Sequence, residues 1–235
     1  LEKVKARLVR SMTRHLELFP IWELWLKKVP GIGPAIAAEL LVLYYARFIP
    51  ICAKCGADMP PIEQKDKENN GGNGDREAWK CGECGHKPKG EGILRHRFEM
   101  KDFATISKWW KYCGLSCDPE TGRKVRKQKG KQSKWSSRGR KLAFWIGDQF
   151  IKRAGDYRAV YDEIKAEKDR KCPDAKKGHK HNMARHETAK LFFSHFWVVA
   201  RTLDGKPVSK PYAQAIMGHT NYVGPFYWDE EPLER

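Results

Sequence analysis

Four cysteines fall in two matched pairs whose spacing suits a bound metal ion. Cys52 and Cys55 lie in the sequence CAKCG, and Cys81 and Cys84 lie in CGECG. The glycine after each second cysteine lets backbone amides turn toward the sulfurs, and four thiolates form the tetrahedral set that Zn²⁺ prefers. A polar stretch, ENNGGNGD, lies between the pairs. We therefore predict a zinc site formed by these four cysteines, in a small zinc ribbon with short flanking strands.

Two other uses of these cysteines fit less well. Disulfides are unusual inside cells, and the charged N-terminus LEKVKARLVRSM has no apolar signal-peptide core. A redox site would need only one Cys-x-x-Cys pair, and His86 is not needed as a ligand when four cysteines complete the set. The other cysteines match no metal-ligand spacing with the nearby histidines, so we expect buried or idle thiols; these residues are Cys113, Cys117, Cys172, His179 and His181.

A tight corner, Val29-Pro-Gly-Ile-Gly-Pro34, separates two apolar, helix-like runs. Glycines at 31 and 33 allow positive φ, and Pro34 suits the first turn of a new helix. Backbone N–H groups at a helix N-terminus favour an anion, and a phosphate is the obvious one. We predict that Gly31, Ile32 and Gly33 contact a backbone phosphate. A plain connector between two helices is the alternative.

The segment from Arg123 to Lys141 contains ten basic residues and no acidic one. The turn-forming sequence PETG comes just before it, so we expect a basic β-hairpin over residues 115–135. Trp135 suits either base stacking or burial. Such a segment gives affinity for a nucleic-acid backbone rather than sequence choice. The predicted DNA-binding residues here are Arg123, Lys124, Arg126, Lys127, Lys129, Lys131, Lys134, Arg138, Arg140 and Lys141.

The whole chain carries a strong positive charge. Its 235 residues include 46 Lys and Arg against 29 Asp and Glu, a formal net charge of +17. Such an excess indicates a polyanionic partner, nucleic acid before membrane. The longest apolar region, residues 35–52, is interrupted by Glu39 and Arg47, which argues against a membrane-spanning helix. We expect a cytoplasmic, nucleoid-associated protein.

Hydrophobic periodicity predicts a mainly α fold that positions these groups. One long apolar segment, LFFSHFWVVA, reads as the core helix, with His195 as a hydrogen-bonded core residue rather than a ligand. The aromatic tail is expected to dock either on this core or on a second subunit. The predicted helices cover residues 1–19 (ending before Pro20), 21–28, 35–48, 101–113 (stopped by Gly114), 136–154, 157–171 and 182–203, with a loop at 172–182.

The corner, followed by Ala37, resembles a helix-hairpin-helix motif, in which hairpin amides hold one DNA phosphate. Three later segments, FATISKWWKYCGL, SKWSSRGRKLAFWIGDQF and HNMARHETAKLFFSHFWVVAR, resemble in order the C-terminal domain of the bridge-RNA-guided DEDD insertion-sequence transposases. The resemblance runs over residues 25–205. It implies a discontinuous helix-hairpin-helix domain (1–50 and 95–205). The zinc ribbon predicted from the cysteines would be an insertion at 51–94 that is not typical of that family, and we expect a C-terminal helix with an aromatic tail at 206–235.

Two departures from that family bear on catalysis. Only 28 residues precede the corner in this sequence, so we expect no RuvC-like domain with the family's acidic metal ligands here. Where the family has a serine nucleophile, this sequence has Thr121, and Ser116 lies out of register. The resemblance thus leaves three readings: a fragment, a subunit completed by a partner, or a DNA-binding descendant without catalysis.

We expect a DNA-binding protein that does not cut or join DNA alone. Two alternatives stay open. One is an active recombinase subunit that uses Thr121 or Ser116 together with a partner's catalytic domain. The other is an RNA-binding zinc-ribbon protein, since basic charge and cysteine knuckles fit structured RNA as well. A homodimer is possible under any of these readings, and no membrane partner is expected.

Overall fold

The structure is a computed structural model that describes residues 2–52, 54–58, 81–86, 95–117, 133, 135–209 and 223–228. The chain divides into two units, which are treated separately. The first comprises Leu1–Leu43 and Phe103–Arg235, and the second comprises Tyr44–Asp102. The second unit therefore includes the segments 44–50 and 95–102, which we had expected to belong to the helical domain.

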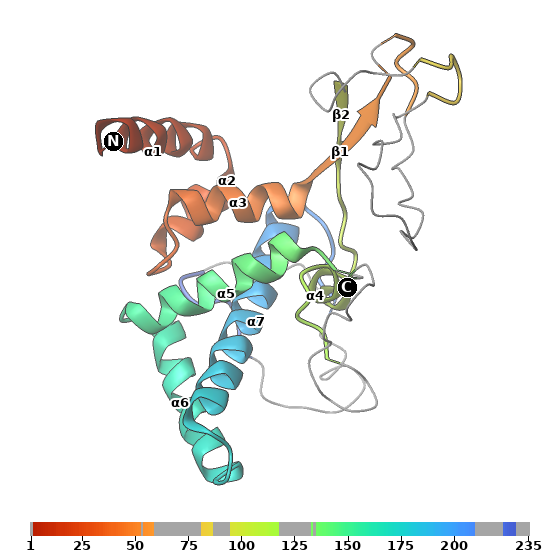
Figure 1. The fold of residues 1–235 in the computed structure, drawn as a ribbon. Coiled ribbons are helices and arrows are strands. Elements are labelled where there is room, and N and C mark those ends of the chain that lie inside the picture. The colour runs from red at the N-terminus through yellow and green to blue at the C-terminus, as the bar shows by residue number, and fades with distance from the viewer. Residues whose placement is uncertain are drawn as a thin grey trace. The chain divides into compact units, whose positions relative to one another are not determined.

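The first unit is helical, as the hydrophobic periodicity predicts, and Figure 1 shows its elements. The helix that begins at Pro34 ends at Tyr45, so its last two residues belong to the second unit. The described helices are α1 (Glu2–Leu16), α2 (Pro20–Leu24), the 3-10 helix η1 (Leu26–Lys28), α3 (Pro34–Tyr45), α4 (Ile106–Tyr112), α5 (Ser137–Lys152), α6 (Asp156–Lys171) and α7 (Lys177–Leu203).

Local signals fix several of the helix ends. The Thr105 hydroxyl accepts a hydrogen bond from the Lys108 amide at 3.3 Å and caps α4. The Ser136 hydroxyl caps α5 in the same way, through the Gly139 amide at 3.1 Å. Gly114 has a φ of +66° just after α4, which confirms it as the predicted stop.

Other boundaries differ from the predictions. The helix predicted over 35–48 ends at Tyr45, because Ala46–Ile51 forms strand β1 instead. The segment predicted to be helical from 101 begins its helix only at Ile106, and that predicted over 21–28 breaks at Trp25. The core helix α7 begins at Lys177, five residues before the predicted 182, so much of the expected loop is helical.

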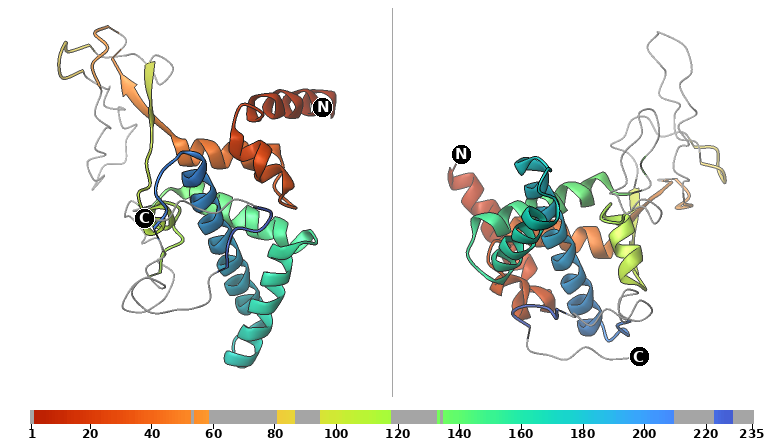
Figure 2. Two further views of the ribbon diagram at one scale, coloured as in Figure 1. Left: turned by 180° about the vertical axis from the view of Figure 1, so that it is seen from behind. Right: turned by 90° about the horizontal axis from the view of Figure 1, so that it is seen from below.

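Aromatic side chains of α7 form the centre of the first unit. Phe192 stacks on Trp25 with ring centroids 5.5 Å apart, and Phe193 stacks on Trp109 at 5.4 Å. All four side chains are buried. In Figures 1 and 2, α6 runs beside α7 and α5 crosses it. The apolar segment of α7 is therefore the core helix, as predicted.

The segment Val223–Trp228 docks on this core. His195 donates from Nε2 to the Val223 carbonyl at 2.9 Å, and Trp25 donates from its indole nitrogen to the Phe226 carbonyl at 2.7 Å. The Tyr227 hydroxyl accepts from the Asp156 amide at 3.1 Å. Of the two docking sites expected for the tail, the structure shows the core of the same chain. The short helix expected near the start of the tail, beyond residue 209, falls outside the described residues.

The second unit contains an antiparallel pair of strands, β1 (Ala46–Ile51) and β2 (Arg95–Met100). The register pairs Ala46 with Met100 and Ile51 with Arg95. The Ile51 backbone also forms a β-bridge with Asp58, so the chain turns back on itself around the first cysteine pair.

Within the part of the chain that the structure describes, no helix is both long and apolar enough to cross a membrane.

Candidate metal centre and nucleic-acid interface

The two cysteine pairs fold into the same backbone turn. The Cys52 amide donates to the Ala57 carbonyl at 2.8 Å, and the Gly56 amide donates back to Cys52 at 2.9 Å. The second pair repeats this, with Cys81 bonded to His86 and Gly85 bonded to Cys81, both at 2.9 Å. Gly56 and Gly85 have φ values of +75° and +68°, which a side chain would strain. The glycine in each Cys-x-x-Cys-Gly is therefore what closes the turn.

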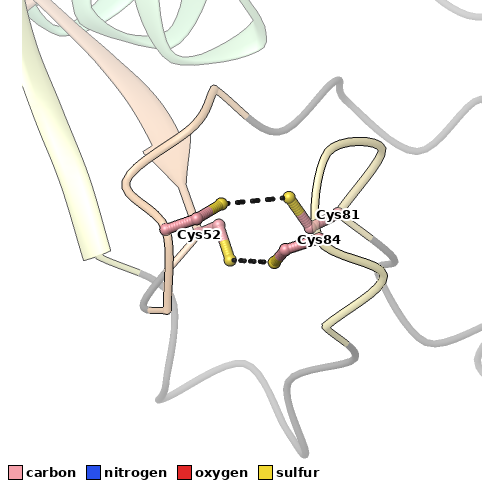
Figure 3. Close-up of side chains that lie close together, drawn as sticks. Cys52, Cys81 and Cys84 are labelled. Atoms are coloured by element: carbon pink, nitrogen blue, oxygen red, sulfur yellow. Dashed lines mark hydrogen bonds between the residues drawn. The ribbon is translucent and has the colours of Figure 1, made fainter.

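The two turns bring all four sulfurs together, as Figure 3 shows. Cys52 Sγ lies 3.6 Å from Cys84 Sγ, and Cys55 Sγ lies 3.5 Å from Cys81 Sγ. All four lie within 4.8 Å of one another. A tetrahedron with metal–sulfur bonds of about 2.3 Å has edges of about 3.8 Å. The cluster therefore has the size and ligand number of a tetrahedral metal site.

Backbone amides lower the pKa of one of the four thiols. The amides of Cys55 and Lys54 donate toward Cys52 and lower the pKa of its thiol to about 6. The Ala57 amide acts in the same direction on Cys55, but the neighbouring sulfurs, Cys84 foremost, outweigh it and raise the pKa of that thiol to about 12. Four sulfurs this close repel one another as thiolates, so a cation is what allows all of them to ionise together.

This group is the one cluster of three or more potential ligands that could hold a metal ion among the residues that the structure describes. Cys113 is buried against the α5 backbone at Gly139, as expected for a core thiol. His181 shares a hydrogen bond of 2.7 Å with the Tyr161 hydroxyl. Neither side chain is thus part of a second cluster of ligands.

The corner between η1 and α3 is a tight turn packed against α5. The Ile32 amide donates to the Val29 carbonyl at 3.1 Å and closes the turn, and the Ile32 side chain is buried. Gly31 has a φ of +95°, and a Cβ there would lie 3.2 Å from Gln149 Cβ. Gly31 and Ile32 therefore shape and anchor the corner.

Gly33 lies on the open side of the same turn. A Cβ at this position would meet no atom within 4 Å. Within the described residues, the amides of Gly33, Ala35 and Ile36 have no backbone partner, while Ala37 donates to Gly33 at 3.0 Å. The start of α3 therefore has backbone amides that are unpaired within the described residues, next to an open position at Gly33, and Lys27 and Lys28, a few residues earlier in the chain, are exposed.

The three predicted DNA-binding residues on α5 have different surroundings. Arg138 forms a two-point ion pair with Glu39, which lowers the pKa of that carboxyl. The Arg140 guanidinium lies 4.9 Å from the centre of the Trp135 ring, and Lys141 Nζ lies 4.6 Å from the centre of the Trp145 ring. The seven other basic residues of the segment, from Arg123 to Lys134, lie outside the described residues.

The sequence analysis did not single out Phe144, Trp145 and Arg185. The two aromatic rings are about half exposed, and Arg185 lies over Phe144 at 3.7 Å. The sequence did contain a signal for exposed rings. Two adjacent bulky residues on a helix point about 100° apart, so the residues of an apolar run such as LAFWI cannot all face one core.

Of the two candidate nucleophiles, Ser116 is partly buried, and Thr121 lies outside the described residues.

Comparisons with protein-family models, curated proteins and solved structures gave no match to this chain. The resemblance to the transposase C-terminal domain therefore depends on the order of the sequence segments alone.

Proposed function

We propose that this chain is a DNA-binding protein that holds the backbone of duplex or junction DNA, related to a transposase C-terminal domain. The observation that carries the proposal is the corner at Val29–Pro34, where the Gly33 position is open and, among the described residues, the amides of Gly33, Ala35 and Ile36 have no backbone partner. The positive end of the α3 dipole and its N–H groups favour a phosphate there. The basic segment 123–141 adds charge along the backbone, consistent with the net charge of +17.

Two observations support a choice among the groups of the corner that we propose to contact the phosphate. The Ile32 amide is already used inside the turn, and Gly31 packs on Gln149. We therefore assign the direct contact to the amides of Gly33 and Ala35, with Gly31 and Ile32 holding the turn in shape. Because such contacts reach only the backbone, they hold every DNA sequence equally well.

Zinc is the metal that we propose for the four-cysteine cluster, within a zinc ribbon built on β1 and β2. Four sulfurs at distances near the edges of a tetrahedron suit Zn²⁺, because structural zinc sites are almost always tetrahedral and often have four thiolate ligands. A closed set of four protein ligands leaves no position for substrate. The metal would therefore stabilise the second unit rather than act in a reaction.

The test compares Gly33→Val with the unchanged protein on several unrelated duplexes and on a four-way junction. A side chain at 33 has room in the protein, so the fold survives while the close approach of a phosphate is blocked. We expect affinity to fall about tenfold on every substrate, the size of one lost charge-assisted contact. The control is Gly178→Val, which places the same side chain in open space at the start of α7.

Equal affinity of Gly33→Val and the unchanged protein would make the corner a plain connector. A structured RNA of similar length serves as a further probe. Tighter binding to this RNA than to any DNA would contradict the proposal and favour the RNA-binding alternative.

A further inference from the structure

Two neighbouring aromatic rings stand out on the surface of α5. Phe144 is 49% exposed and Trp145 is 46% exposed, whereas Leu142, Ile146 and Phe150 on the same helix are buried. The helix therefore already has a complete buried face without them. Two adjacent exposed rings on one helix form a larger apolar patch than a single exposed side chain does, and such a patch marks a surface for a ligand or partner.

Each exposed ring has a cation over it. Lys141 Nζ lies 4.6 Å from the Trp145 ring centre, and Arg185 Cζ lies 3.7 Å from the Phe144 ring centre. Lys141 is one turn before Trp145 on α5, while Arg185 comes from α7. The two helices approach closely because Gly147 has no side chain, since a Cβ there would lie 2.7 Å from Arg185 Cγ. The four side chains, Lys141, Phe144, Trp145 and Arg185, are called the α5 patch below.

Helix α5, which provides three of the four patch residues, carries more basic than acidic residues, although Arg138 is paired with Glu39. Helix α5 carries four basic residues, at 138, 140, 141 and 152, and one acidic residue, Asp148. Asp148 is paired with Lys152 at 2.6 Å. Rings alternating with cations match a ligand that alternates flat bases with phosphates, and they fit an apolar protein surface poorly.

We propose that the α5 patch binds unpaired nucleotides, with bases stacked on Trp145 and Phe144 and the adjoining phosphates neutralised by Lys141 and Arg185. Base-paired DNA does not offer its base faces in this way, whereas single strands and unpaired segments at junctions do. The inference deepens the proposed function, because it adds a second contact to a protein that holds the DNA backbone at the corner.

The test uses a single strand of about 16 thymidines, the upper end of common site sizes, and a duplex of mixed sequence at the same salt concentration. Affinity and the quenching of tryptophan fluorescence are both measured. We expect Trp145→Ala and Phe144→Ala each to weaken single-strand binding about tenfold, which is within the range for one stacked base. Duplex binding should change less than twofold. Trp145→Phe keeps a ring and should restore most of the affinity.

Leu18→Ala is the control. Leu18 is 77% exposed, so this substitution removes apolar surface at a position far from α5 in the sequence.

The inference fails if the single strand does not bind, if Trp145→Ala binds it as well as the unchanged protein does, or if Trp145→Ala loses affinity equally for the single strand and the duplex. A change in oligomeric state of Trp145→Ala by sedimentation would instead make the patch a contact between copies. If the duplex still binds and responds to Gly33→Val, the proposed function stands while the inference fails. If the unchanged protein binds neither the single strand nor the duplex, both the proposed function and this inference are overturned.

Discussion

The Tyr157 hydroxyl donates a hydrogen bond to Nδ1 of His195 at 2.7 Å, while the other ring nitrogen of His195 donates to the Val223 carbonyl at 2.9 Å. This arrangement fixes the imidazole in its neutral form, with the proton on Nε2. It also ties α6, α7 and the C-terminal segment together at one buried point. Burial is the main reason that the pKa of His195 falls to about 4.

This histidine should make the stability of the first unit depend on pH. Between pH about 6.5 and about 4, the unfolded chain binds a proton that the folded chain excludes. The stabilisation is therefore fully present above pH about 6.5 and is lost as the pH falls to about 4, by at most on the order of 3 kcal/mol. Urea unfolding of the helical signal at a series of pH values measures this loss.

Matched variants assign the pH effect to its residue. His195→Gln should flatten the dependence in this window, although it costs some stability at neutral pH. His181→Gln is the control, since His181 shares a similar hydrogen bond with Tyr161 but is only partly buried. A pH profile unchanged in His195→Gln would place the titrating group elsewhere.

The four-cysteine cluster predicts one equivalent of zinc in the purified protein. Cys81→Ser should remove the metal, because three thiolates and a hydroxyl bind Zn²⁺ far more weakly than four thiolates do. Metal analysis and the rate of zinc transfer to a chelator measure the effect. Cys172→Ser is the control, since Cys172 lies outside the cluster and should leave one equivalent in place. Less than half an equivalent in the unchanged protein would contradict the zinc assignment.

The basic segment should govern how binding responds to salt. If Arg123, Lys124, Lys127 and Lys131 each neutralise a phosphate, changing all four to Gln should flatten the log–log salt slope by roughly 3 to 4 units, at about 0.9 per phosphate. Binding to one duplex at several salt concentrations provides the measurement. An unchanged slope would place the DNA away from this segment.

What the sequence predicts well is local. The cysteine cluster follows from two short motifs whose ligands and turn glycines sit within five residues of one another. The helix stop at Gly114 and the core position of His195 likewise depend on nearby residues and on a long apolar run. Such signals need no knowledge of distant partners.

The errors arise where distant segments decide the structure. Residues 46–48 continue an apolar helical pattern, but they form β1 because a strand some 50 residues later pairs with them, as Ala46 pairs with Met100. The exposed pair Phe144 and Trp145 was missed for a related reason. Which side of α5 faces the core is set by its crossing with α7 at Gly147, and a run of five apolar residues does not reveal it.

The crossing of α5 and α7 gives the last prediction. A Cβ on Gly147 would lie 2.7 Å from Arg185 Cγ and 2.9 Å from the Arg185 carbonyl oxygen, and a backbone atom cannot move aside as a flexible side chain can. Gly147→Ala should therefore push the helices apart and destabilise the fold by about 1–3 kcal/mol, despite the better helix propensity of alanine.

Thermal unfolding measures this cost, because a loss of that size lowers Tm by roughly 2–4 °C per kcal/mol in a chain of this length. Gly178→Ala is the matched control. It lies in the first turn of α7, where a Cβ meets no atom within 4 Å, so alanine should raise stability by about 0.4–1 kcal/mol. If Gly147→Ala is as stable as Gly178→Ala, the close crossing of α5 and α7 is wrong. The position of Arg185 over Phe144, which depends on that crossing, would then be wrong as well.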